Sequence, residues 1–160
     1  MTLRQLTSLD LAYLAGVVDG DGCINAQIVR RHDYVLKFQI RVTVTVFQKT
    51  TRHWFILYLQ KEIGAGNVRK RPDGISEYAL VGTSSVKQLL EALLPYLKLK
   101  KKQAKLVLHI VENLSKSQDP EAFLKLCEVV DTIADLNDSK KRILKASVVR
   151  SELGLDEISH

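Results

Sequence analysis

Hydrophobic positions repeat along the chain with two periods, one typical of strands and one typical of helices. Residues 36–48 give the clearest alternation of apolar with polar side chains, the apolar ones being Phe38, Ile40, Val42, Val44 and Val46. This alternation predicts a strand that buries one face. Shorter alternations predict further strands at 23–29, 66–71 and 76–82, the last two joined by the turn Pro72-Asp73-Gly74.

Apolar positions three or four residues apart predict several helices, with capping residues at their starts and glycine or proline at their ends. They span 8–18 with Ser8 as N-cap, a segment from Thr50 or Thr51 to just before Gly64, one from Ser84 or Ser85 to Pro95, 101–114, a segment beginning at Asp119-Pro120, and 139–152. The order is αββαββα with further helices after it. We expect an α/β (α+β) fold that forms a single domain over 1–160.

Composition narrows the class of partner. The chain has 24 Lys and Arg against 18 Asp and Glu, a formal net charge of +6, which suits a polyanionic partner. Cys23 and Cys127 lie far apart, so a disulfide framework or a cysteine zinc site is not expected. No apolar run is long enough for a membrane span and the first residues carry no secretory signal, so we expect no membrane partner.

Two carboxylates, Asp19 and Asp21, follow the first predicted helix. Negative charge is unfavourable at the C-terminal end of a helix, so the pair needs a compensating cation, either a Lys or Arg side chain or a divalent metal. Gly20 and Gly22 are expected to stop the helix, to allow positive φ and to admit a phosphate closely. A plain polar turn explains the same pair, because Asp-Gly steps are common in turns.

Small residues inside this helix indicate a close contact with another helix. Gly16 costs about 1 kcal/mol relative to alanine in a helix, so a packing reason is expected for it. If the partner is the same helix of a second copy, two acid-bearing ends meet on a two-fold axis. The predicted dimer interface comprises Leu11, Ala12, Ala15, Gly16 and Asp19.

The string at 14–22, LAGVVDGDG, resembles the LAGLIDADG motif of homing endonucleases, with six of nine letters matching. The resemblance extends over roughly 9–150. Over this range the chain is similar to the single-motif, homodimeric subgroup of that family. It includes Gln48-Lys49-Thr50, Arg52, Trp54-Phe55, the run 96–100, Lys102-Gln103-Ala104 and the run 136–140.

The resemblance implies an αββαββα core, a curved antiparallel sheet that binds DNA, and a homodimer through the motif helices. Asp21 would ligate Mg²⁺, with Mn²⁺ as a possible substitute, and the Gly20 carbonyl would be a second ligand. Gln48, Arg52 and Lys100 would surround the scissile phosphate, and Asp19 would have a structural role near the helix end.

The family's activity would be a staggered double-strand cut of a long, pseudo-palindromic DNA target, leaving 3′ overhangs, in the spread of mobile introns. Residence in an organelle, the chloroplast before the mitochondrion, follows from the family alone. No small-molecule substrate is expected. An RNA-binding intron maturase and a DNA-binding regulator that has lost cleavage remain as alternatives.

The residue types at the outward positions of the predicted strands independently indicate contacts with DNA bases. A plain solvent-facing sheet would be rich in Lys, Glu and Thr, whereas Arg pairs with guanine and Asn or Gln with adenine in the major groove. The outward set is Asn25, Gln27, Arg31, Gln39, Arg41, Thr43, Thr45, Arg69 and Arg71, with Glu77, Asp33 and Tyr34 nearby. A soluble sheet face with no partner is the alternative.

Four lysines and one serine near the predicted helix starts are candidates for phosphate contacts, which depend on salt and carry little sequence information. The candidates are Lys49, Lys98, Lys102, Ser139 and Lys140, some of which would simply be solvated. The four histidines are scattered, so a His-metal site is not supported. Trp54, Phe55 and Tyr58 are expected in the core.

Overall fold

The computed structural model describes residues 3–114, 119–139 and 142–155. Along the chain its elements are α1 (Ser8–Asp21), β1 (Gly22–Arg30), β2 (Phe38–Lys49), the 3₁₀ turn η1 (Thr50–Arg52), α2 (His53–Ile63), β3 (Asn67–Lys70), β4 (Ile75–Val81), α3 (Thr83–Leu93), α4 (Lys101–Leu114), α5 (Pro120–Leu136) and α6 (Ala146–Glu152). The predicted αββαββα order with further helices is confirmed.

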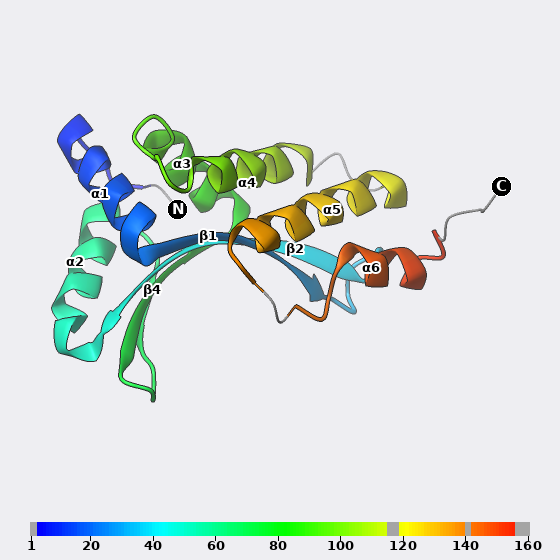
Figure 1. The fold of residues 1–160 in the computed structure, drawn as a ribbon, viewed down its shortest axis with the longest axis horizontal. Helices are drawn as coiled ribbons and strands as arrows, with labels where there is room; N and C mark the ends of the chain where they lie inside the picture. Colours follow the sequence, from blue (N-terminus) through cyan, green and yellow to red (C-terminus); the bar gives the residue numbers. More distant parts are fainter. Residues whose placement is uncertain (1–2, 115–118, 140–141, 156–160) are drawn as a thin grey trace.

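The four strands form one antiparallel sheet in the order β1-β2-β4-β3. The sheet arches, with α3, α4 and α5 over its convex side and its concave side open (Figure 1). The core between sheet and helices is apolar, and its fully buried side chains include Ile24, Phe38, Leu80, Leu89, Leu90, Leu93 and Ile110. The alternation read from the sequence therefore divides the sheet into a packed face and an open face.

The first helix is longer than the sequence predicts and begins with a different cap. The N-cap is Thr7, whose hydroxyl accepts from the Asp10 N–H while the Asp10 carboxylate accepts from the Thr7 N–H, a capping box. The helix continues through Gly20 to Asp21, so the expectation that Gly20 stops it is wrong. Helical hydrogen bonds within the motif outweigh the weak helix propensity of glycine.

Gly22 is required for space rather than for positive φ. Its φ is −105°, and a Cβ there would lie 2.8 Å from the Val18 Cα and 3.0 Å from the Thr45 carbonyl oxygen. Both neighbours are backbone atoms, which cannot move aside easily. The glycine therefore allows the chain to pass directly from α1 into β1, which fixes Asp21 at the junction.

Three other predictions from the sequence are wrong in detail. Helix α3 begins at Thr83 after Gly82, which has a φ of 111°, instead of at a serine cap. The helix expected over 139–152 is confined to Ala146–Glu152, because residues 142–145 run alongside β1. Trp54 and Tyr58 are 65% and 40% exposed, and Ile56, Leu59 and Ile63 form the buried face of α2 instead.

Candidate active site and nucleic-acid interface

Asp21, Gln48 and Arg52 form a continuous hydrogen-bonded chain at the junction of α1 and the end of β2. The Gln48 Nε2 donates to the Asp21 Oδ2 at 2.7 Å, and the Arg52 Nε donates to the Gln48 Oε1 at 2.7 Å. The amide of Gln48 is thereby oriented from both ends. The sequence separation of these residues hides their proximity, which arises because β2 returns antiparallel beside β1 and ends next to Gly22.

Lys100 supplies the cation that the end of α1 needs. Its Nζ donates to the carbonyl oxygens of Val18 at 3.0 Å and Asp19 at 2.6 Å. These carbonyls carry the partial negative charge of the helix C-terminus, so the ammonium stabilises it. Lys100, which the resemblance places around the scissile phosphate, thus has its ammonium on the C-terminal end of α1.

Asp19 and Asp21 have different surroundings. The Asp19 carboxylate accepts from the backbone N–H of Lys98 at 2.8 Å and of Lys100 at 3.0 Å. Burial raises the pKa of Asp19, but hydrogen bonds from the Lys98, Lys100 and Leu99 backbone outweigh it, and the pKa lies below its usual value. Asp19 is thus a structural cap for the turn that carries Lys100.

Asp19→Asn is expected to lower the free energy of unfolding by about 1 kcal/mol at neutral pH, because the charged acceptor is lost. Because folding lowers the pKa of Asp19, its carboxylate stabilises the fold fully at pH values above its ordinary pKa of 3.8 in the unfolded chain. This stabilisation is lost as the pH falls through the lower pKa of the folded state. The difference between variant and wild type should therefore shrink below about pH 4. Urea unfolding at several pH values and fixed protein concentration measures it, with Glu112→Gln as control; a difference constant from pH 7 to pH 2.5 would contradict the assignment.

Asp21 has the properties of a metal ligand. Its side chain is exposed, and the Gln48 amide occupies only Oδ2, which leaves the other carboxylate oxygen for a cation. The Gly20 carbonyl belongs to the last turn of the helix, where carbonyls lack intrahelical donors. Within the described residues no group of three or more His, Cys, Asp or Glu could hold a metal. The donor set fits Mg²⁺, which accepts one or two carboxylates and completes its shell with water and phosphate oxygens.

Most side chains predicted to read bases lie on the open face of the sheet. Register pairs Asn25 with Thr43, Gln27 with Arg41 and Arg69 with Glu77, and all of these positions have the same parity as the open face. Even-numbered β1 and β2 neighbours such as Ile24 and Val44 are buried on the other face. The placement also includes Thr45 and Gln39, so the structure brings eight of the predicted residues onto one concave surface.

Two arginines of the β3–β4 hairpin are held by acids. The Arg69 Nη2 lies 2.9 Å from the Glu77 Oε2, and the Arg71 Nη2 lies 2.7 Å from the Asp73 Oδ2. Arg71 also lies over the Phe47 ring, 5.9 Å from its centroid. Glu77 therefore orients Arg69, while Asp73 in the turn holds Arg71.

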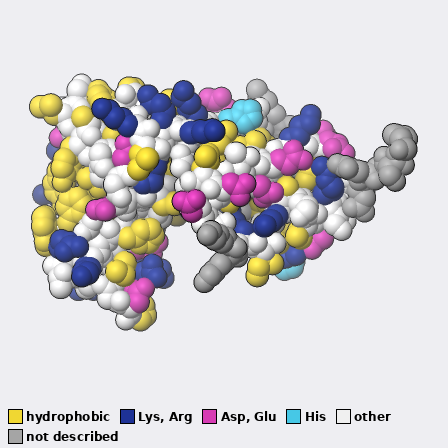
Figure 2. Space-filling view, viewed as in Figure 1, with side chains coloured by type: hydrophobic (Ala, Val, Ile, Leu, Met, Phe, Trp, Pro, Cys, Tyr) yellow, Lys and Arg dark blue, Asp and Glu magenta, His cyan; other side chains and the backbone are white. Residues whose placement is uncertain are grey.

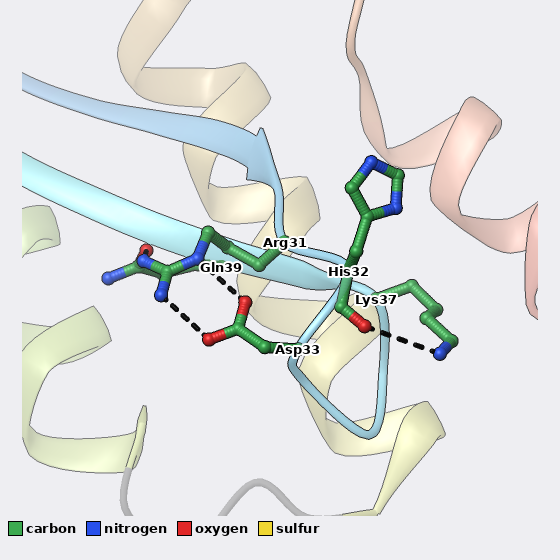
Figure 3. A network of polar contacts seen from close by, with 5 residues as sticks. All are labelled: Arg31, His32, Asp33, Lys37 and Gln39. Carbon is green, nitrogen blue, oxygen red and sulfur yellow. Dashed lines mark hydrogen bonds and ion pairs between the residues drawn. The ribbon is translucent and has the colours of Figure 1, made fainter.

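The predicted readers at the β1–β2 hairpin form one network, of which Figure 3 draws Arg31, Asp33 and Gln39. The Arg31 Nη2 lies 2.9 Å from the Asp33 Oδ2, and its Nη1 donates to the Gln39 Oε1 at 2.9 Å. The Arg31 guanidinium also lies over the Tyr34 ring, 4.6 Å from its centroid. The hydrogen bond from Arg31 holds the pKa of Asp33 below its usual value. The four side chains are thus oriented together at the hairpin.

The sequence did not reveal a contact with the edge strand β1 that is made by Asn137, at the end of α5, and by Arg142, in the C-terminal segment 142–155. The Asn137 Nδ2 donates to the Ile24 carbonyl at 2.9 Å, and Arg142 donates to the Ala26 carbonyl and the Asn25 side chain. Burial lowers the pKa of Arg142, while the Asp131 charge acts in the opposite direction. An arginine next to a lysine run looks like a surface charge in sequence, so no local signal separates it from its neighbours.

The structure describes four of the five residues predicted to contact phosphates. Lys49, Lys98, Lys102 and Ser139 are exposed. Ser139 lines a groove with Asn25 and Gln27. Lys140 lies outside the described residues.

The free face of α1 and α2 is unusually apolar. Leu9, Tyr13, Trp54, Leu57 and Tyr58 are exposed, and Figure 2 shows hydrophobic side chains gathered over these two helices at the left of the view. Such a contiguous patch marks an interaction surface.

The residues of α1 predicted for the dimer interface differ in how exposed they are in the single chain. Gly16 and Ala12 are exposed and Leu11 is half-buried, so they are open to a partner. Ala15 is 0% exposed and belongs to the chain's own core, so its predicted place in a dimer interface is wrong. A face of small residues at helical spacing does not reveal which of them the sheet already covers.

The exposed acid at the end of α1, beside the Gln48–Arg52 pair and the open polar sheet, offers the carboxylate and the positive charge that phosphodiester-processing enzymes use. The profile described as LAGLIDADG endonuclease matches residues 14–111. The chain belongs to the LAGLIDADG endonuclease family.

Its relatives include DNA endonuclease I-CvuI of Chlorella vulgaris, 54% identical over 89% of this chain and 88% of the relative. DNA endonuclease I-CreI of Chlamydomonas reinhardtii is 49% identical over the same shares. A crystal structure of I-CvuI in complex with its target in the presence of Ca superposes with a TM-score of 0.88, at 52% identity over 92% of this chain and 94% of that chain. A second structure of I-CvuI, with the I-CreI target and Mg, gives a TM-score of 0.87. No helix among residues 3–114, 119–139 and 142–155 is long and apolar enough to cross a membrane.

Proposed function

We propose that this chain is a site-specific, divalent-metal-dependent DNA endonuclease of the intron-homing type, formed by a single domain over 1–160. The observation that carries the proposal is the chain Asp21–Gln48–Arg52 at the end of the motif helix, beside the open face of the sheet. Relatives named DNA endonucleases cover nearly nine-tenths of the chain and support it. The product would be a double-strand break with 3′ overhangs in a long pseudo-palindromic target.

The active form is a homodimer in this proposal. Cutting two strands symmetrically requires one acid per strand, and each copy supplies one Asp21. The apolar face of α1 and α2 supports the assembly, because Leu9 and Trp54 are 84% and 65% exposed in the single chain. Gly16 supports it too, since a Cβ there would meet nothing within 4 Å among the described residues, and a closely packed partner helix would give its small size a reason.

The residues of one chain supply part of a metal site in which Mg²⁺ is the proposed ion and Mn²⁺ a substitute. The Asp21 carboxylate and the Gly20 carbonyl would hold it. When bound, the ion would polarise the phosphate and favour ionisation of a water. The structures of I-CvuI with Ca and with Mg support a divalent ion in the family.

The remaining chemistry belongs to this chain's own side chains. Gln48 holds the unliganded edge of Asp21 in place by its 2.7 Å hydrogen bond. Arg52 and Lys100 bring positive charge to the site, where it stabilises the charge that develops on the phosphate. Neither a His nor a Glu adjoins Asp21 in the motif, so ordered water is the proposed route for the proton.

The concave sheet is the proposed DNA-reading surface. Arg31, Gln39, Arg41, Arg69 and Arg71 offer the donors and acceptors that major-groove edges require. They act with Asn25, Gln27, Asp33, Tyr34, Thr43, Thr45 and Glu77. Lys49, Lys98, Lys102, Ser139 and Lys140 are the proposed phosphate contacts, with Asp19 as a structural residue near the interface.

Cleavage of supercoiled plasmid tests this function. The plasmids carry candidate sites, first the I-CvuI target and the I-CreI target present in the solved structures and then sites selected from a randomised library. Linear product with Mg²⁺ and none with EDTA is expected. Tight binding without cutting would indicate a non-cleaving regulator, and binding of intron RNA without DNA cleavage would indicate a maturase; either result would overturn the proposal.

Organellar residence, with the chloroplast before the mitochondrion, is the proposed location. The relatives from Chlorella vulgaris and Chlamydomonas reinhardtii support it. Sequencing the genome around the coding region tests it directly. An open reading frame inside a nuclear gene would contradict the proposal.

A further inference from the structure

Arg142 contacts both the backbone and a side chain of β1 from a distant part of the sequence. Its Nη1 donates to the Ala26 carbonyl oxygen at 2.6 Å, and its Nη2 donates to the Asn25 Oδ1 at 2.6 Å. A guanidinium has only donors in a rigid fork, so the two acceptors fix its plane. Arg142 is itself half-buried, which limits competition from water.

This contact decides which way the Asn25 amide faces. An asparagine amide has one oxygen and one nitrogen, and only the oxygen can accept from Arg142. Oδ1 therefore faces Arg142, and the opposite end of the amide, Nδ2 with its two N–H donors, faces away from the guanidinium. Without Arg142 the amide could turn by 180° and offer either atom.

The amide lies where nucleic acid would meet the sheet. Asn25 is on the open face, directly across from Thr43 of β2. Asn25, Gln27, Ser139 and Arg142 line a groove of about 600 Å³ between β1 and the C-terminal segment. The groove therefore combines predicted base readers with a predicted phosphate contact.

We propose that Arg142 is a specificity-determining positioning residue, which holds Asn25 so that its side chain offers only N–H donors to the base opposite it. The inference rests on the proposed DNA-cleaving function. A free asparagine reads adenine by accepting from N6 and donating to N7, which needs both ends of the amide. A donor-only amide suits guanine, whose N7 and O6 are both acceptors, and it meets an unfavourable donor at N6 of adenine.

Selection of cleaved sites from a randomised DNA library tests the inference, using the full chain and four variants. Asn25→Ala identifies the base position that Asn25 reads. The wild type is expected to prefer guanine over adenine there by about tenfold, the discrimination typical of one good side-chain–base contact. Arg142→Lys keeps the charge but cannot hold both acceptors, so this preference should fall to about twofold while other positions keep theirs.

Asn25→Asp tests the inference independently, because the aspartate keeps a side-chain oxygen that can accept a hydrogen bond from Arg142. One carboxylate oxygen accepts from Arg142 and the other faces the base, so the preference should switch from guanine to cytosine, whose N4 is a donor. Arg150→Lys is the matched control, because the Arg150 Nη2 lies 3.2 Å from the Glu128 Oε1 on α5, and no hydrogen bond or ion pair joins Arg150 to β1 within the described residues. Its profile should equal that of the wild type.

A guanine preference that survives Arg142→Lys would overturn the inference, as would adenine at the Asn25 position of the wild type. An even loss over all positions would also overturn it, because Arg142 would then only stabilise the C-terminal segment. A library in which the wild type enriches no site would refute the proposed function instead. An enriched site that Asn25→Ala leaves unchanged would refute this inference alone.

Discussion

Asp21→Asn is expected to reduce DNA cleavage by about a thousandfold while DNA affinity changes by less than about threefold. Asparagine has the shape of aspartate, and its oxygen still accepts the hydrogen bond that the Gln48 Nε2 gives at 2.7 Å. The change removes only the negative charge that holds the cation. Single-turnover cleavage in Mg²⁺ and a gel-shift assay in Ca²⁺ measure the two quantities.

Asp135→Asn is the matched control, since Asp135 is an exposed acid on α5 and loses the same charge. It should cleave like the wild type. Asp21→Asn protein that cleaves at the wild-type rate would remove Asp21 from the metal site, and loss of DNA binding in parallel would show that the change disturbs the fold. Unfolding by urea distinguishes the second result.

Gly16→Leu is the second substitution with a large expected effect, the conversion of the dimer to a monomer. Within one chain the new side chain meets open space, and leucine favours helix over glycine by about 1 kcal/mol. The fold of the single chain should therefore persist. At a helix–helix contact the same side chain would hold the two backbones apart.

Sedimentation equilibrium at micromolar concentration measures the change, and circular dichroism verifies the helix content. Thr132→Leu is the control, because Thr132 is an exposed residue of α5 and lies outside α1 and α2, whose free face is the proposed interface. A Gly16→Leu protein that stays dimeric would place the interface elsewhere. A dimer disrupted equally by Thr132→Leu would mean that added leucine acts through aggregation or unfolding.

The sheet was predictable because its physics is local. A period of two fixes which face each side chain occupies, so Ile24 and Asn25 fall on opposite faces whatever the rest of the chain does. Once the strands are paired, the open face of Gln27, Arg41 and Arg69 follows. The acid at the α1–β1 junction follows in the same way, since Asp21 directly precedes the strand.

The predictions are wrong where the burial or contact of a residue depends on segments far away in the sequence. Trp54 has the hydrophobicity of a core residue, yet α2 turns Ile56 and Leu59 inward and leaves Trp54 65% exposed. Helical periodicity shows that a face is apolar but not whether the chain itself covers it. Arg142 is a stronger case, because its contact with Asn25 spans 117 positions and no periodic signal marks it.

The contacts along the free edge of β1 affect how readily a strand of another molecule can pair with the sheet. A strand at a sheet border exposes unpaired carbonyls, to which a foreign strand can add and start a polymer. Here Asn137 and Arg142 occupy the carbonyls of Ile24 and Ala26. These two acceptors are therefore not free to pair with the strand of another molecule, which removes part of that border as a template for fibre growth.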